Sequence, residues 1–96
     1  MGATTPGAAE PAEIRLKRLR MRAWRRGTKE MDLILGPFAD ARLEGLEPEA
    51  LGRFERLLDE NDQDLYAWIT GQGEPPPALA GLIAEIGAHA RTRLAR

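Results

Sequence analysis

The 96-residue sequence contains no cysteine and no serine, and His89 is its single histidine. The absence of cysteine excludes disulfides and thiolate zinc sites, and it leaves carboxylates as the main side chains that could join His89 around a metal. Without serine or cysteine, a catalytic nucleophile would have to be a threonine, tyrosine, lysine or carboxylate. So short a chain also buries only ~60–65% of its unfolded surface, which leaves little room for a deep cleft. We therefore expect no enzyme activity, no catalytic residue and no metal site.

Long apolar runs are also missing. No run approaches the ~18 residues that a membrane span requires. The opening segment MGATTPGAAEPAE lacks the features of a secretory signal and the arginines of a mitochondrial presequence. We expect a cytoplasmic protein that does not bind membranes, with a disordered tail over residues 1–12 and one domain over residues 13–96.

Two features of β proteins are scarce in this sequence, namely period-two alternation and β-branched side chains. Apolar residues recur instead at helical spacing between glycine-containing and proline-containing breakers. The sequence therefore predicts an all-α fold, a compact bundle of five short helices. The expected helices run from about residue 13 to 26, from Thr28 through Leu43, from Pro48 into the segment ending at Glu60, over residues 63–70, and from Leu79 to the C-terminal arginines.

Several residues predict where these helices begin and end. Gly27 is expected to end the first helix in the left-handed conformation, and Thr28 to cap the second. Asn61 or Asp62 should cap the fourth helix. Pro37 lies inside the second apolar pattern and predicts a kink or a break there. The predicted core includes Met31, Ile34, Leu35, Phe38, Leu51, Phe54, Leu57, Leu58 and Trp68.

The net charge of −1 conceals a strong asymmetry along the chain. Residues 15–29 contain eight basic residues and no acidic one, whereas residues 30–74 contain twelve acidic residues and three arginines. This pattern predicts a positive face and a negative face. Sequence-specific DNA binding is disfavoured, because the helix after the glycine turn, KEMDLILGPFADAR, is acidic and apolar. Loose polyanion binding by the first helix remains an alternative, as does a basic face that is solvated or paired with the acidic helices.

Other candidate chemistry has a simpler explanation. Trp24, Tyr66 and Trp68 could stack on a base or a flavin ring, but Trp68 is expected in the core and Trp24 is the better surface candidate. His89 borders the apolar face of the last helix and is best interpreted as a packed or surface residue. The carboxylates of residues 59–64 lack the glycine and glutamate of a calcium loop, so helix capping explains them better.

Two sequence blocks resemble a known family. RRGTKEMDLILGPFAD, followed by FERLLDENDQDLYAWITGQGEPP, is similar to the SdhE family of five-helix assembly factors, over about residues 14–90. The family's Arg-Gly-x-x-Glu motif is present as residues 26–30. The resemblance implies an assembly factor that promotes covalent attachment of FAD to the flavoprotein subunit of succinate dehydrogenase, and also to that of fumarate reductase where one exists.

The resemblance further implies that the corner between the first two predicted helices, residues 25–32, faces the partner. Arg26 would supply a directional cation, Gly27 would permit close approach, and Glu30 and Asp32 would accept hydrogen bonds; Arg25 completes the predicted set. The FAD is expected to be carried by the client, with no cofactor bound stably by this chain, which we expect to be a monomer when free. Two alternatives stay open: a nucleic-acid-binding or toxin-binding regulator, and a flavinyl transferase that holds FAD itself, although a glycine-rich phosphate loop is missing.

Overall fold

The computed structural model describes residues 10–94, and nearly all of the predicted tail lies outside this range. Within it the chain forms helices and connecting turns, without a strand. The all-α prediction and its five helices are therefore confirmed for the described residues. The elements in order are α2 (Ala12–Trp24), α3 (Lys29–Arg42), the 3-10 turn η1 (Leu43–Gly45), α4 (Pro48–Leu57), α5 (Asp62–Ile69) and α6 (Pro77–Leu94).

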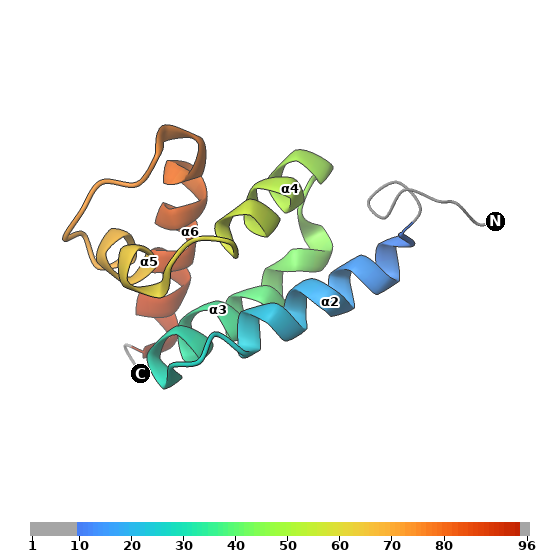
Figure 1. Ribbon diagram of the computed structural model, residues 1–96, viewed down its shortest axis with the longest axis horizontal. Helices are drawn as coiled ribbons and strands as arrows, with labels where there is room; N and C mark the ends of the chain where they lie inside the picture. The colour runs from blue at the N-terminus through green and yellow to red at the C-terminus, as the bar shows by residue number, and fades with distance from the viewer. Residues whose placement is uncertain (1–9, 95–96) are drawn as a thin grey trace.

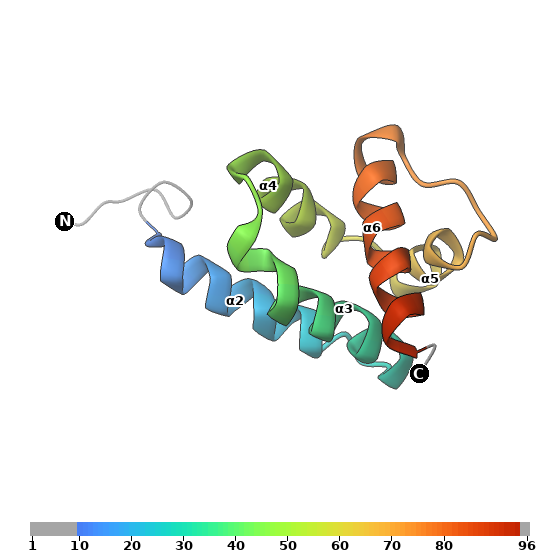
Figure 2. The ribbon, with the colours of Figure 1, turned by 180° about the vertical axis from the view of Figure 1, so that it is seen from behind.

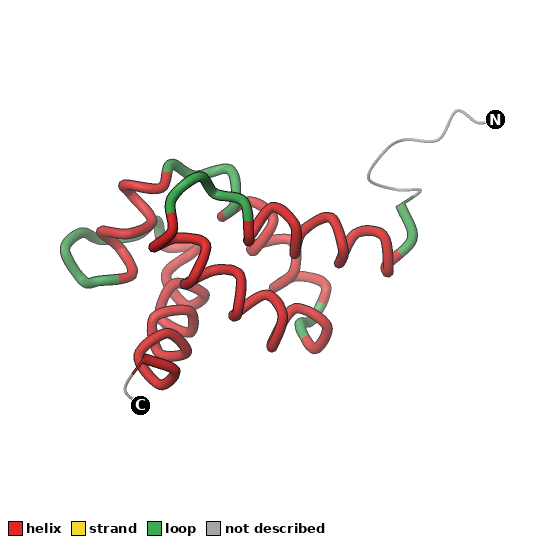
Figure 3. The backbone as a smooth tube through the Cα atoms, turned by 90° about the horizontal axis from the view of Figure 1, so that it is seen from below, coloured by secondary structure: helices red, strands yellow, loops and turns green. Residues whose placement is uncertain are grey.

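The helices pack as a hairpin covered by three further helices. α2 and α3 lie side by side and antiparallel, joined by the turn that contains Gly27 (Figures 1 and 3). α6 crosses α3 and also contacts α4 and α5 (Figure 2). Near the C-terminal end of α6, Arg93 contacts the carbonyl of Leu33 in α3. Across the part of the chain that the structure describes, no helix has the length and apolar character needed to cross a membrane.

The helix ends agree closely with the sequence signals. The Thr28 hydroxyl accepts a hydrogen bond from the Met31 N–H, and Asn61 accepts from two N–H groups at the start of α5. Pro48 occupies the first turn of α4. Gly27 has φ +104°, which confirms a positive φ at this turn, although α2 already ends at Trp24. The short η1 turn was not predicted.

Of the two alternatives predicted at Pro37, a kink or a break, the break is wrong, because α3 continues from Lys29 to Arg42. Proline lacks an N–H, so the carbonyl of Leu33, four residues earlier, loses its helical partner. In the structure the Arg93 guanidinium of α6 donates a hydrogen bond to this carbonyl at 3.2 Å. The packing of α6 against α3 therefore supplies the missing donor, and the buried side chains on both sides of Pro37 hold the helix together.

The core lies between the α2–α3 hairpin and the other three helices. Phe38 of α3 and Phe54 of α4 are both fully buried, and their rings stack with centroids 5.9 Å apart. The expectation of full burial is wrong for Trp68, which, like Ile34 and Leu51, is only partly buried against the core. The fully or nearly fully buried apolar residues include Leu19, Ala23, Met31, Leu35, Phe38, Leu43, Phe54, Leu57, Leu58, Leu65 and Ile86.

Close packing of α2 on α3 depends on Gly36. A Cβ atom at Gly36 would lie 2.3 Å from the indole ring of Trp24, far inside van der Waals contact. The same indole remains 38% exposed on its other side, and its Nε1–H donates to Asp40 at 3.1 Å. Trp24 therefore lies at the surface, as the sequence suggested, but it also closes the α2–α3 contact.

Candidate partner-binding site

A row of arginines on α2 and just after it pairs with acidic residues that lie before α2, in α4, in the loop after α4 and at the start of α5. Residues 15, 18, 22 and 26 are spaced three or four apart, so they lie on one side of the helix and its extension. Their acidic partners are residues 10, 55, 59 and 62, at distances of 2.8 to 2.9 Å. Four of the eight basic residues at positions 15–29 thus pair with acidic residues of the same chain. For these four arginines the arrangement favours the ion-paired interpretation of the basic helix over a free positive face.

Glu55 is the central acceptor of this row. It receives hydrogen bonds from Arg15 and from Arg18. Burial alone would raise the pKa of Glu55, but the hydrogen bonds from Arg18 and Arg15 lower it below its usual value overall. The hydrogen bonds that Arg18 donates to Glu10 and Glu55 raise the pKa of Arg18 in turn. The two pairs at Glu55 are partly solvated, so each contributes at most ~1 kcal/mol, and together they help to fix how α2 lies against α4.

Arg26 ends the row and is the most enclosed of its arginines, with a side chain only 11% exposed. Its Nε donates to Asp62 at 2.8 Å, its Nη2 donates to the carbonyl of Glu60 at 2.6 Å, and its Nη1 donates to the carbonyl of Leu58. The two carbonyls belong to the turn that follows α4, where donors are otherwise lacking. Arg26 therefore fastens the α2–α3 corner to the α4–α5 loop, a role that the sequence did not predict.

Asp32 secures the same corner from the other side. Its carboxylate accepts the backbone N–H of Arg26 at 2.7 Å, and its side chain is half-buried in the first turn of α3. The turn is thus held at Arg26 by Asp32 and at Thr28 by its own cap on Met31. Both contacts fix the backbone on either side of Gly27.

The remaining predicted site residues point outward. Arg25, Gly27 and Glu30 are all exposed. A Cβ atom at Gly27 would have no neighbour within 4 Å, so the space outside this turn is open. The structure divides the predicted site into Arg26 and Asp32, which hold the corner, and Arg25, Gly27 and Glu30, which form its surface. We call these three residues the exposed corner.

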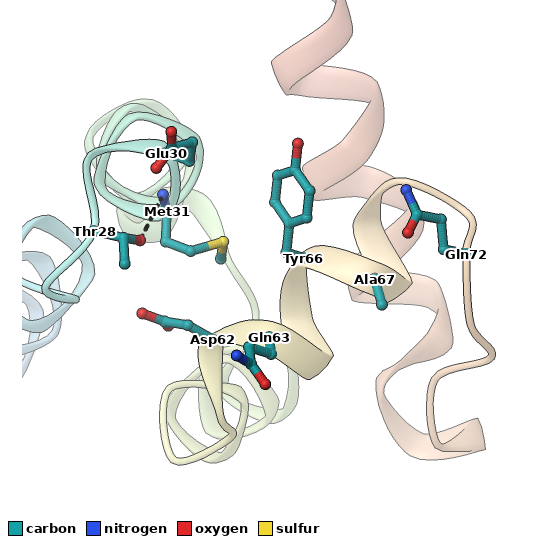
Figure 4. Close-up of a pocket in the computed structure, with 8 residues that line it drawn as sticks. All are labelled: Thr28, Glu30, Met31, Asp62, Gln63, Tyr66, Ala67 and Gln72. Atoms are coloured by element: carbon teal, nitrogen blue, oxygen red, sulfur yellow. Dashed lines mark hydrogen bonds between the residues drawn. The ribbon is translucent and has the colours of Figure 1, made fainter.

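A hollow lies beside the exposed corner, between the start of α3 and α5 (Figure 4). Its volume is about 460 Å³. The ring of Tyr66 rises from α5 opposite the side chain of Met31, with Glu30 and Asp62 at the edges (Figure 4). The hollow is lined by Thr28, Glu30, Met31, Asp62, Gln63, Tyr66, Ala67 and Gln72.

Tyr66 was named from the sequence among three aromatics that could stack on a ring, but Trp24 was preferred as the surface residue. In the structure Tyr66 is 42% exposed, and its place beside the corner was not predicted. The available signal was its distance of four residues from Asp62, which puts both on one face of α5, away from the buried Leu65 and Ile69.

The other candidates have structural roles. His89 packs its ring edge-on against Phe38, with centroids 5.7 Å apart, at the contact between α3 and α6. Of the carboxylates at residues 59–64, Asp59 and Asp62 pair with arginines, while Asn61 caps α5. Within residues 10–94 no group of three or more His, Cys, Asp or Glu side chains could hold a metal ion.

Comparison with protein families matches residues 17–90 to the family described as flavinator of succinate dehydrogenase. This match includes the corner, the hollow and every arginine of the row except Arg15. The chain belongs to this family. The family resemblance inferred from the two sequence blocks is thereby confirmed.

Curated relatives carry related names. The FAD assembly factor SdhE of Pseudomonas aeruginosa is 42% identical over 66 residues, covering 69% of this chain and 77% of the relative. The FAD assembly factor SdhE of Photobacterium profundum is 37% identical over 73 residues, covering 75% of this chain and 83% of the relative. The mitochondrial succinate dehydrogenase assembly factor 2 of Mycosarcoma maydis is 43% identical over 70 residues, but these make up only 29% of that longer protein. No solved structure matches the chain.

Proposed function

We propose that this protein is an assembly factor that binds the flavoprotein subunit of succinate dehydrogenase and promotes covalent attachment of FAD to it. The same activity would extend to the flavoprotein of fumarate reductase where one exists. The observation that carries the proposal is the Arg-Gly-x-x-Glu corner, presented on a rigid turn in a chain of this family. None of the comparisons supports the nucleic-acid-binding or toxin-binding alternative.

The proposed docking surface is the exposed corner. Gly27 has neither a side chain nor a neighbour outside it, so a partner backbone can approach the turn closely. Glu30 offers a carboxylate in the first turn of α3, and Arg25 offers a cation on the other side of the turn. Arg26 and Asp32 contribute indirectly, because their contacts within the chain hold this turn in place.

The proposed mechanism does not require a catalytic group on this chain. In the chemistry that the family resemblance implies, the reacting atoms would be a histidine nitrogen of the client and the 8α-methyl carbon of its flavin, so both would belong to the client and its FAD. By binding one arrangement of the client's FAD domain better than others, the assembly factor would increase the population in which these atoms meet. A rigid docking corner suits this role, since a flexible one would lose binding free energy to ordering.

The cofactor and the location belong to the same proposal. FAD would be carried by the client, with none held stably by this chain in isolation, and the protein would act as a cytoplasmic monomer. Flavin fluorescence titration of the isolated protein tests the cofactor part. Saturable quenching at micromolar FAD would instead support a transferase that holds the flavin itself.

Co-expression with the flavoprotein subunit of its own host tests the function directly. The client should co-purify with this protein, and its intact mass should rise by one covalently bound FAD relative to client expressed alone. The matched control is Met21→Ala, which removes a 44% exposed side chain of α2 outside the exposed corner and should preserve both results. A client whose flavin content does not depend on this protein would contradict the proposal.

A further inference from the structure

We propose that the hollow between α3 and α5 receives one basic side chain of the flavoprotein client, and that arginine fits it best. This inference rests on the proposed function, because it names the chemical group that the client would present beside the exposed corner. It assigns a binding role to Tyr66, a residue outside the Arg-Gly-x-x-Glu motif.

The lining of the hollow offers apolar surface to a long side chain. Tyr66 and Met31 stand on opposite sides of it, on α5 and α3 (Figure 4). Ala67 adds a small apolar surface to the lining. The aliphatic stem of an arginine or lysine can lie along such surfaces while its charged head stays at the edge.

The charges around the hollow favour a cation. Its two ionisable lining groups besides Tyr66 are the carboxylates of Glu30 and Asp62, and none of the lining residues is basic. Asp62 already accepts a hydrogen bond from Arg26 at 2.8 Å. Glu30 is exposed, and no ion pair within the described residues engages it. Glu30 is therefore the carboxylate left to pair with a partner.

Tyr66 makes arginine a better fit than lysine. A guanidinium is planar, so it can stack on the exposed phenol ring while two of its N–H groups donate to the Glu30 carboxylate. An ammonium group forms a point contact and is more strongly hydrated. The combination of an aromatic ring and a carboxylate across one hollow thus selects a planar cation with an apolar stem.

The test measures the affinity of the purified flavoprotein subunit for four variants, Tyr66→Ala, Tyr66→Phe, Glu30→Gln and the double variant Tyr66→Ala/Glu30→Gln. Each alanine or glutamine single variant should weaken binding by about 10-fold, corresponding to one cation–π contact or one charged hydrogen bond. Tyr66→Phe keeps the ring and should bind within about 3-fold of the wild type. Thermal unfolding of each variant, beside the Met21→Ala control, separates lost contacts from lost folding.

The double variant decides whether both residues contact the same group. If one client side chain contacts both Tyr66 and Glu30, the affinity of the double variant should be about 10- to 30-fold below that of the wild type. This is little more than the loss in the weaker-binding single variant. Independent contacts would instead give a loss of about 100-fold, which would overturn the inference.

Reversing the charge tests the sign of the occupant. Glu30→Lys should weaken binding clearly more than Glu30→Gln, because it places a cation against the client's cation. Equal binding by these two variants, or unchanged binding by Tyr66→Ala, would overturn this inference while the wild type still binds. A wild-type protein that fails to bind the flavoprotein at all would overturn the proposed function and, with it, this inference.

Discussion

Two glycines of the α2–α3 hairpin are required for opposite reasons. Gly27 has φ +104° and open space where a side chain would be, whereas Gly36 lies inside α3 with the Trp24 ring 2.3 Å from the position of a Cβ atom. At Gly27 the backbone conformation is unusual and the surroundings are empty. At Gly36 the conformation is ordinary and the surroundings are full. Gly27 lies where a partner could approach, whereas Gly36 lies inside a packed contact. A substitution at Gly27 should therefore reduce client binding, and a substitution at Gly36 should reduce the free energy of unfolding.

Gly27→Arg should have the largest effect, and on client binding. A side chain at this positive φ costs ~1–2 kcal/mol of folding free energy, which a domain of ordinary stability survives. A long charged side chain would also separate surfaces that must meet, so affinity for the flavoprotein should fall by more than ~100-fold. Pull-down and covalent flavin content measure the loss, and circular dichroism measures the fold.

Gly27→Ala is the matched control for this variant, because it carries the same backbone strain with little added bulk. It should lose similar stability but retain much more binding than Gly27→Arg. If the wild type and the folded arginine variant pull down the flavoprotein equally well, Gly27 only ends the helix and does not contribute to docking.

Gly36→Ala should destabilise the fold by ~1–3 kcal/mol, since the new methyl group displaces the Trp24 ring. The cost should fall close to zero in a Trp24→Ala background, where the ring is absent. Urea unfolding of the four proteins of this cycle gives the coupling energy. Gly52→Ala in α4 is the control, because its Cβ would meet nothing and alanine should stabilise the helix by ~0.5–1 kcal/mol there. A Gly36→Ala cost that persists without Trp24 would show that the ring is not its cause.

Arg26→Lys tests how the exposed corner is held in place. Lysine keeps the charge but cannot donate to Asp62 and to the carbonyls of Leu58 and Glu60 at the same time. We expect a loss of ~1–2 kcal/mol of stability. Client binding should also weaken, although the Arg26 side chain is only 11% exposed and offers a partner little direct contact. Hydrogen exchange should increase in the turn after α4. An unchanged unfolding free energy would mean that these contacts contribute nothing to the corner.

A pH titration examines the packed side of α3, where the smallest effect is expected. Burial, followed by the charges of Arg93 and Arg42, lowers the pKa of His89 below its usual value. Below a pH of ~6.5 the unfolded chain therefore binds a proton at this residue before the folded chain does. The free energy of unfolding should fall as the pH drops through this range, and His89→Gln should lack this part of the decrease. A His89→Gln profile parallel to that of the wild type would contradict the assignment.

Local signals in the sequence predicted the helices well. Thr28, Asn61 and Pro48 act within three or four residues, and each lies at a helix start in the structure. The same kind of local rule predicted a kink or a break at Pro37, and the break was wrong. The donor that replaces the missing hydrogen bond comes from Arg93, sixty positions after Leu33, and no local pattern contains it.

The same distinction explains what the sequence predicted about the site. Two blocks of sequence placed the motif at residues 26–30 and suggested the family, which the comparisons confirm. They did not show that Arg26 turns inward while Glu30 stays exposed, because the acceptors of Arg26 lie 32 to 36 positions later. The hollow beside Tyr66 is lined by residues of both α3 and α5, so no pattern within either segment predicts it.

The contacts of Arg26 tie the motif to a distant part of the chain. A chain that ended before α5 would contain the whole Arg-Gly-x-x-Glu motif, yet it would lack Asp62, one of the three acceptors that hold the Arg26 side chain. In the proposed complex, a client that docks on the exposed corner would therefore bind the complete chain more tightly than a chain truncated before α5.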